Sequence, residues 1–294
     1  MAEAETGRKI SCLITDAFLS FAGSIAENLS IPWIPVWTPV PHSLSAHIYT
    51  DMIRQRYANS VSHDCSNSVE LEDQTLDVPG LSEFRIGDLP AEVLPQRDAK
   101  RNSLFLHVSI SIPPPSLPPS TEDVTGCLSW LDGQKAKSVA FISFGTVVNI
   151  PQSEIEELAE ALEVSGTPFL WALRDSMSDC LPSGFLDRAS THGKVVPWAP
   201  QIQVLAHSSI SVFITHCGAN SVYESIANGV PMICRPFFAD HKLNARLIAD
   251  EWRAGGRGIR SRAQDLKELV LKASSPGGRA SQDFKTLVEK ITSV

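Results

Sequence analysis

The sequence predicts an α/β fold in which a parallel sheet carries helices on both of its faces. After residue 137, short apolar runs alternate with longer segments whose apolar residues recur at helical spacing. Such alternation is typical of strand–helix–strand units, which build parallel sheets. A proline-rich segment, PPPSLPP at residues 113–119, suits a stiff linker. The 294 residues are enough for two α/β domains, one on each side of this linker.

Composition and charge narrow the class of protein. Apolar residues make up 43% of the chain and charged residues 20%, which is typical of a globular protein with a hydrophobic core. The net charge is -8 and no Lys/Arg-rich run occurs, so no nucleic-acid partner is expected. The polar N-terminus and the lack of a long apolar run predict a cytoplasmic protein outside the membrane. Six scattered cysteines without a C-x-x-C pair favour reduced thiols, and we expect a monomer.

The N-terminal part contains two strand–helix pairs. The predicted strands are residues 10–15, which should be buried, and 34–37, and the predicted helices are residues 17–29 and 42–56. Asp16 follows the first strand, in a position that fits a functional carboxylate and a helix N-cap equally well. His47 lies on the second helix, where a solvated or core histidine is the ordinary interpretation.

The C-terminal part has the more regular pattern. Strands are expected at residues 138–144, 169–173, 194–197, 211–215 and 231–235. Helices are expected at residues 152–164, 201–207, 220–228, 240–252, 265–273 and 282–291. The predicted division is a partial N-terminal domain at 1–112, the linker at 113–120, a ligand-binding domain at 121–258 and terminal helices at 259–294.

The stretch from Trp198 to His241 carries the strongest functional signal. Residues 216–221, HCGANS, lie between a predicted strand and the helix that follows it. Gly218 is expected to allow a tight turn there, and the helix N-terminus has free N–H groups beside a histidine and hydroxyl donors. This combination suits a diphosphate.

Other side chains of this stretch fit the rest of a nucleotide ligand. Glu224 lies one helical turn after Asn220 and could accept two hydrogen bonds from a ribose diol. Trp198 could stack on a flat base, and the pair Asp240-His241 ends the next strand at the same edge of the sheet. Each residue alone has an ordinary structural explanation in the core, on a solvated face or in a helix cap. Their joint placement at the ends of strands favours a nucleotide pocket.

These motifs resemble the signature box of the plant secondary-metabolite UDP-glycosyltransferases. The matching motifs are WAPQ at residues 198–201, HCGANS at 216–221, GVP at 229–231 and DH at 240–241, with SFGT at 143–146 outside the box. Details such as CRPFFADHKLNAR are most similar to flavonoid and anthocyanidin 3-O-glycosyltransferases. The resemblance implies a GT-B fold with two Rossmann-like domains, the N-terminal one incomplete.

The resemblance also implies a role for each matching residue. The UDP-sugar would be bound by Thr38, Ser143, Thr146, Trp198, Ala199, Gln201, His216, Gly218, Ala219, Asn220, Ser221, Glu224, Asp240 and His241. Within this set Trp198 would stack on uracil, and Asp240 and His241 would contact the sugar hydroxyls. The acceptor, a flavonoid or anthocyanidin, would be lined by Phe18, His47 and Phe238. Asp16 would orient the catalytic histidine.

The implied reaction is an inverting hexosyl transfer. A histidine base takes the proton of the acceptor hydroxyl, which attacks C1 of the sugar as UDP leaves. No metal or separate cofactor is implied, because His216 and the helix N-terminus would stabilise the diphosphate. His241 stands where glutamine is commoner in the family, which favours UDP-galactose over UDP-glucose as the donor. Ala219 replaces the usual tryptophan, and we expect weaker packing there but not loss of binding.

The sequence also departs from the family pattern. No histidine precedes Asp16, since the first one is His42, and the segments at 106–116 and 253–266 look shortened. These departures predict an N-terminal domain that lacks its front. A catalytically dead fragment that binds only UDP-sugar is therefore the alternative to an active enzyme. An NAD-binding dehydrogenase is disfavoured, because no G-x-G-x-x-G motif follows a strand.

Overall fold

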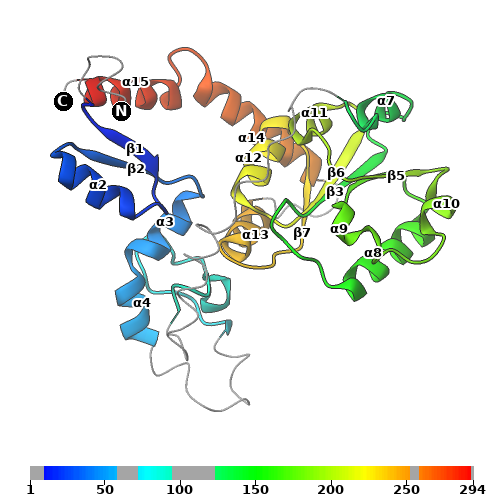
Figure 1. Ribbon diagram of the computed structural model, residues 1–294, viewed down its shortest axis with the longest axis horizontal. Coiled ribbons are helices and arrows are strands. Elements are labelled where there is room, and N and C mark those ends of the chain that lie inside the picture. Colours follow the sequence, from blue (N-terminus) through cyan, green and yellow to red (C-terminus); the bar gives the residue numbers. More distant parts are fainter. Residues whose placement is uncertain (1–9, 58–71, 95–122, 252–257, 293–294) are drawn as a thin grey trace.

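The computed structural model describes residues 10–57, 72–94, 123–251 and 258–292. These residues form an α/β structure with two separate parallel sheets (Figure 1). The larger sheet has five strands in the order β5-β4-β3-β6-β7, and the smaller sheet pairs β1 with β2. The predicted α/β class with parallel strands is confirmed. The predicted linker at 113–120 lies outside the described residues.

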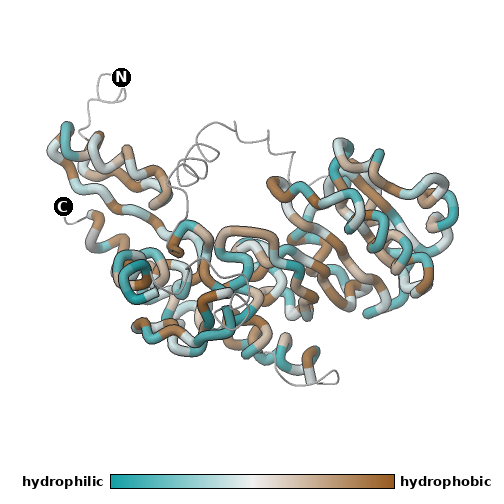
Figure 2. The backbone as a smooth tube through the Cα atoms, turned by 90° about the horizontal axis from the view of Figure 1, so that it is seen from below, coloured by the Kyte–Doolittle hydropathy of each residue, from teal (hydrophilic) through white to brown (hydrophobic). Residues whose placement is uncertain are grey.

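The five-stranded sheet contains every strand predicted for the C-terminal part, each within one residue at either end. Its strands are β3 (Val139–Ser143), β4 (Phe169–Ala172), β5 (Gly193–Val196), β6 (Ile210–Thr215) and β7 (Met232–Cys234). β3 is central, between β4 and β6, and all of its residues are buried. A strand that is covered on both faces appears in the sequence as an unbroken apolar run. Figure 2 shows hydrophobic residues concentrated along these strands.

Helices cover both faces of the larger sheet (Figure 1). One face packs against α8 (Gln152–Ser165), α9 (Asp175–Ser178) and α10 (Phe185–Ala189), and the other against α7 (Cys127–Asp132), α11 (Gln201–Ala206), α12 (Ala219–Asn228) and α14 (Ile259–Ser274). On the second face Phe141 stacks on Phe213 with the ring centroids 4.9 Å apart. Helices α7, α9 and α10 were not predicted from the sequence, because such short helices show too little periodicity to be recognised.

The smaller sheet is covered on one side only within the described residues. It pairs β1 (Leu13–Asp16) with β2 (Trp33–Val36), and α2 (Phe21–Leu29) packs against both strands. The prediction of a buried first strand is wrong, because Ile14 is 48% exposed. Successive side chains of a strand point to opposite faces, so one helix buries only half of a two-stranded sheet. The helix itself begins at Phe21, four residues later than predicted.

The predicted helix at 42–56 is two helices, α3 (Pro41–Ile48) and α4 (Thr50–Tyr57). Tyr49 separates them with φ -95 and ψ 17, which is outside the helical region. Both helices pack with the 3-10 helix η2 (Ile86–Asp88) around a separate hydrophobic cluster that includes Leu243 of α13 (His241–Glu251). Helix α13 therefore joins the N-terminal part to the five-stranded sheet.

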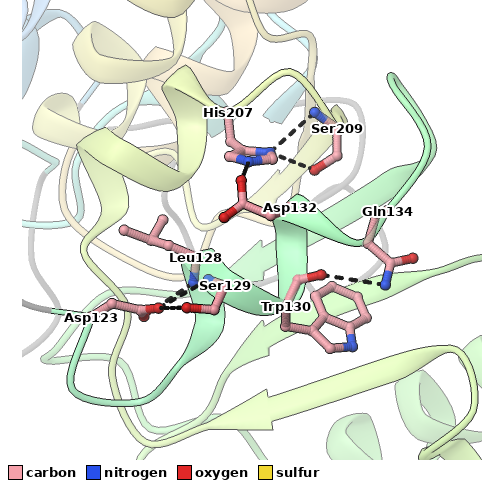
Figure 3. Close-up of polar contacts among 8 residues, drawn as sticks. All are labelled: Asp123, Leu128, Ser129, Trp130, Asp132, Gln134, His207 and Ser209. Atoms are coloured by element: carbon pink, nitrogen blue, oxygen red, sulfur yellow. Dashed lines mark hydrogen bonds and ion pairs between the residues drawn. The ribbon is translucent and has the colours of Figure 1, made fainter.

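A polar network attaches α7 to the segment before β6 (Figure 3). His207 Nε2 lies 3.2 Å from Asp132 Oδ1, and His207 Nδ1 lies 2.8 Å from Ser209 Oγ. Burial works against ionisation of Asp123, but hydrogen bonds from Ser129 and Leu128 outweigh it and lower the pKa of Asp123 to about 2. Although Ser, His and Asp are all present, Ser209 is 1% exposed, so we interpret the network as structural.

The chain ends in two helices that are longer than predicted. α14 contacts α12, and α15 (Arg279–Thr292) follows it. α15 leaves apolar side chains exposed, including Phe284 at 67%. Within the part of the chain that the structure describes, no helix combines the length and apolar character needed to cross a membrane.

Candidate functional site

A cavity of about 190 Å³ lies where β6 and β7 end. It is lined by Thr38, Pro39, His216, Gly218, Ala219, Asn220, Ser221 and Asp240. The first two residues follow β2, and the others follow β6 or β7, so both parts of the chain contribute to the wall. Ligands of open α/β sheets bind at the carboxyl ends of strands, which is where this cavity lies.

The turn after β6 fixes the ring of His216 between two glycines. A Cβ atom on Gly218 would lie 2.5 Å from His216 Nε2, and one on Gly145 would lie 2.9 Å from the same atom. Gly218 does not need its conformational freedom here, because it has φ -60 and the residue with positive φ is Cys217, at 65. Glycine is required at 218 by the close approach of the imidazole.

Two histidines of the site are uncharged at neutral pH. Burial lowers the pKa of His216 to about 4, and the backbone of Ser143 only partly offsets this. Burial also lowers the pKa of His241 to about 4, and the nearby His216 lowers it further. The two rings meet edge-on with their centroids 4.8 Å apart. A neutral imidazole offers a ligand an N–H group and not a fixed positive charge.

The N-terminus of α12 borders the cavity. Gly218 is its N-cap and no side chain caps the helix, which leaves the N–H groups of the first turn available to a ligand. Asn220 and Ser221 add polar side chains at the same place. This ten-residue helix therefore presents N–H donors and a favourable dipole to an anion.

Gln201 holds the carboxylate of Glu224 in place. Its Nε2 donates to Glu224 Oε2 at 2.7 Å and to Ser221 Oγ at 3.0 Å. No donor among the described residues is hydrogen-bonded to the other carboxylate oxygen, Oε1. Trp198 is half-buried and precedes Ala199, which belongs to the core.

Asp240 lines the cavity and is hydrogen-bonded by a residue that the sequence analysis missed. Asn244 Nδ2 donates to Asp240 Oδ2 at 2.9 Å and to the Cys217 carbonyl at 2.8 Å. Burial raises the pKa of Asp240, whereas the bond from Asn244 and the charge of His47 lower it. The one sequence signal for Asn244 is its spacing, one helical turn after Asp240.

Asp16 is connected to the cavity through Thr38. Its Oδ2 accepts a hydrogen bond from Thr38 Oγ1 at 3.3 Å, and its Oδ1 accepts one from the Phe18 N–H at 2.9 Å. Asp16 is not the N-cap of α2, because Ser20 occupies that position. The alternative of a helix cap is therefore wrong for this helix.

Two of the predicted acceptor residues form an aromatic cluster. The ring of Trp37 lies 5.0 Å from that of Phe18 and 4.9 Å from that of His47, centroid to centroid. His47 Nδ1 lies 2.7 Å from the carbonyl oxygen of Ser43. The third predicted acceptor residue, Phe238, is 41% exposed and contacts His241.

The cavity brings together half of the residues predicted for UDP-sugar binding. The predicted residues outside its lining are Ser143, Thr146, Trp198, Ala199, Gln201, Glu224 and His241. Thr146 is exposed, and Arg174, which the sequence analysis missed, donates to its carbonyl at 2.9 Å. Among the described residues, no group of three or more His, Cys, Asp or Glu side chains is arranged to hold a metal ion.

The parallel sheet, with a cavity and the uncapped N-terminus of α12 at the ends of its strands, defines an open-sheet α/β protein, and proteins of this class bind ligands at that edge. The family model described as "UDP-glucoronosyl and UDP-glucosyl transferase" matches residues 122–269. The anthocyanidin 3-O-galactosyltransferase of Rhododendron delavayi is 41% identical, over 98% of this chain and 76% of the relative. The chain therefore belongs to the UDP-glycosyltransferase family, whose sugar donor is a UDP-sugar.

Other known proteins support the same assignment. A flavonol 3-O-glucosyltransferase of Actinidia chinensis var. chinensis is 40% identical, over 99% of this chain and 76% of the relative. The solved structure of a UDP-glucose: anthocyanidin 3-O-glucosyltransferase in complex with UDP superimposes with a TM-score of 0.85 at 38% identity, covering 100% of this chain and 78% of that one. The predicted GT-B fold is thereby confirmed. The match to the Rhododendron protein extends over 356 residues, more than the 294 of this chain, so that relative has residues inside the matched stretch that this chain lacks.

Proposed function

We propose that the chain transfers a hexose from a UDP-sugar to a hydroxyl of a flavonoid-type acceptor, with inversion at the anomeric carbon. The observation that carries the proposal is the position of His216, which is clamped between two glycines beside the free N–H groups of α12. The ring and these N–H groups suit the two phosphates of UDP. The names of the relatives support the acceptor class, since they act on anthocyanidins and flavonols.

The diphosphate and the sugar of the donor would occupy the cavity, and the nucleoside would extend beyond the residues that line it. Uracil would stack on Trp198, and the ribose diol would bind the preorganised carboxylate of Glu224. The sugar would lie beside Asp240 and Thr38, which both line the cavity. In this assignment residues 1–112 supply the acceptor side and residues 121–258 supply the donor side.

The chemical step requires a base for the acceptor proton. The hydroxyl oxygen would attack C1 as the bond from C1 to the phosphate oxygen breaks, and UDP would leave with that electron pair.

The second candidate function is binding of UDP-sugar without transfer. It is favoured by Asp16, because the carboxylate is hydrogen-bonded to Phe18 and Thr38 and no histidine of the described residues is hydrogen-bonded to it.

One assay separates the two candidates. The purified chain is mixed with UDP-glucose or UDP-galactose and a flavonol, the products are identified by mass spectrometry, and UDP affinity is measured by calorimetry. A hexosylated flavonol at rates of ordinary enzymes supports transfer. UDP binding without product supports the binding module. The absence of UDP binding at millimolar concentration would overturn both.

His241→Gln is expected to lower the preference for galactose over glucose. The Nδ1 atom of His241 lies 3.4 Å from the backbone nitrogens of both Phe237 and Phe238, which fixes the ring and leaves Nε2 to carry the proton. A flexible amide would present its polar atoms in another direction. The measurement is the ratio of the two donor affinities, or of kcat/KM where turnover occurs.

The matched control for His241 is Lys242→Gln, because Lys242 is the next residue and is exposed. It should leave the galactose-to-glucose ratio unchanged. An unchanged ratio in His241→Gln as well would contradict the assignment of donor specificity to His241.

A further inference from the structure

We propose that Asn244 is a positioning residue that aligns the two ends of the donor pocket with a single side-chain amide. One N–H of the amide would hold the turn that carries His216, and the other would direct Asp240 toward the sugar. This inference rests on the proposed function, because it assigns these two ends to the diphosphate and to the hexose.

The direction of the amide is fixed by its partners. Nδ2 lies 2.8 Å from the Cys217 carbonyl oxygen and 2.9 Å from Asp240 Oδ2. A carbonyl and a carboxylate only accept hydrogen bonds, so both must face the NH₂ group. Asn244 is fully buried. The opposite oxygen, Oδ1, is also buried and has no hydrogen-bond partner among the described residues, so the NH₂ group makes both of the side-chain hydrogen bonds found for Asn244 there.

The bond to Cys217 supports a turn that is otherwise unfavourable. Cys217 has φ 65, in the left-handed region that residues other than glycine seldom adopt. Its carbonyl group is buried and would lose its partner without Asn244. The flanking residues His216 and Gly218 both line the cavity, so the geometry of the turn determines where the diphosphate donors lie.

The bond to Asp240 occupies one carboxylate oxygen and leaves the other for a ligand. Helix α13 is in turn anchored from the N-terminal part, since Leu243 is fully buried in the cluster around α4 and η2. Arg246 Nε lies 3.8 Å from Asp88 Oδ2. Leu243 and Arg246 thus hold α13 in place through contacts outside the cavity. The amide of Asn244 then fixes Asp240 and the Cys217 carbonyl relative to this helix.

Asn244→Leu tests the role in donor binding, because leucine has a similar volume and no donor. Calorimetry with UDP and with UDP-glucose gives the ratio of the two affinities, which is the gain in affinity that the sugar provides. We expect this gain to fall by at least about tenfold, as for the loss of a hydrogen bond to a charged group. In an Asp240→Ala background, which has no acceptor for the amide, Asn244→Leu should cause no further loss of the gain, because the two residues act through one interaction. Additive losses would overturn the proposal.

Ser211→Ala is the matched control. It removes another buried hydrogen bond of the same domain, from Ser211 Oγ to the Val139 carbonyl, at the far end of β6. It should lower thermal stability and leave the gain from the sugar unchanged. If Ser211→Ala reduced the affinity gained from the sugar as much as Asn244→Leu does, the effect would be a general structural one and the proposal would be overturned.

A measurement without any ligand keeps the inference separate from the proposed function. Titration of the Asp240 carboxyl carbon by NMR should give a higher pKa in Asn244→Leu than in the wild type, since the amide donor that favours the charged form is gone. Asn244→Ser should shift it in the same direction and serves if the leucine variant does not fold. An unchanged Asp240 pKa would overturn the role of Asn244, whereas failure of UDP-glucose to bind the wild type would overturn only the proposed function.

Discussion

Gly218→Ala is expected to weaken UDP binding by about 100-fold while the domain stays folded. The new Cβ would lie 2.5 Å from His216 Nε2, far inside van der Waals contact. The ring cannot retreat toward Gly145, because that backbone is also close. His216 must therefore leave its position, and the first turn of α12 shifts with it. Loss of one or two hydrogen bonds to a charged phosphate accounts for a change of this size. Calorimetry with UDP measures it.

Gly133→Ala is the control for this prediction. A Cβ at residue 133 would meet the Trp130 carbonyl at 3.5 Å, an ordinary contact, and its φ of -79 suits any residue. UDP affinity should be unchanged in this variant. If Gly218→Ala bound UDP as tightly as the wild type, the assignment of the diphosphate to this turn would be contradicted.

Gly218 also illustrates what sequence can predict about this site. Its place in a turn after a buried strand is evident from the pattern, as are the neighbouring Asn220 and Asp240, because strand ends gather on one edge of a parallel sheet. The reason for the glycine is not evident. It depends on the ring of His216 folding back over the turn, which is a contact in space and leaves no trace in spacing.

Elements that depend on their own sequence pattern were likewise predicted well, whereas features that depend on contacts in space were not. β3 and β6 were placed within one residue, because burial on both faces leaves an unbroken apolar run. The exposure of Ile14 on β1 was not predicted, because it depends on how many elements cover the smaller sheet. Asn244 was missed for a similar reason, since its partner Cys217 is far away in the sequence.

Acidification from pH 6.5 to pH 4 is expected to destabilise the folded chain through His216 and His241. Burial lowers the pKa of each ring from 6.5 to about 4, so the folded state keeps both neutral where the unfolded state binds a proton. The unfolded state therefore gains protons first, and stability is complete above pH 6.5 and lost as pH falls toward 4. Each ring accounts for on the order of 3 kcal/mol at the acidic end.

The double variant His216→Asn, His241→Gln isolates this effect from the carboxylates that titrate in the same range. Asp240 acts in the opposite direction, because its raised pKa makes the folded state bind a proton first as pH falls. The two histidine contributions are not additive, since each ring lowers the other's affinity for a proton. Urea unfolding at pH 7, 6 and 5 should therefore show a wild-type free energy of unfolding that falls more steeply than that of the variant. Parallel pH profiles would mean that both rings are accessible to protons in the folded state, and the site would then lack the neutral imidazole pair on which its geometry depends.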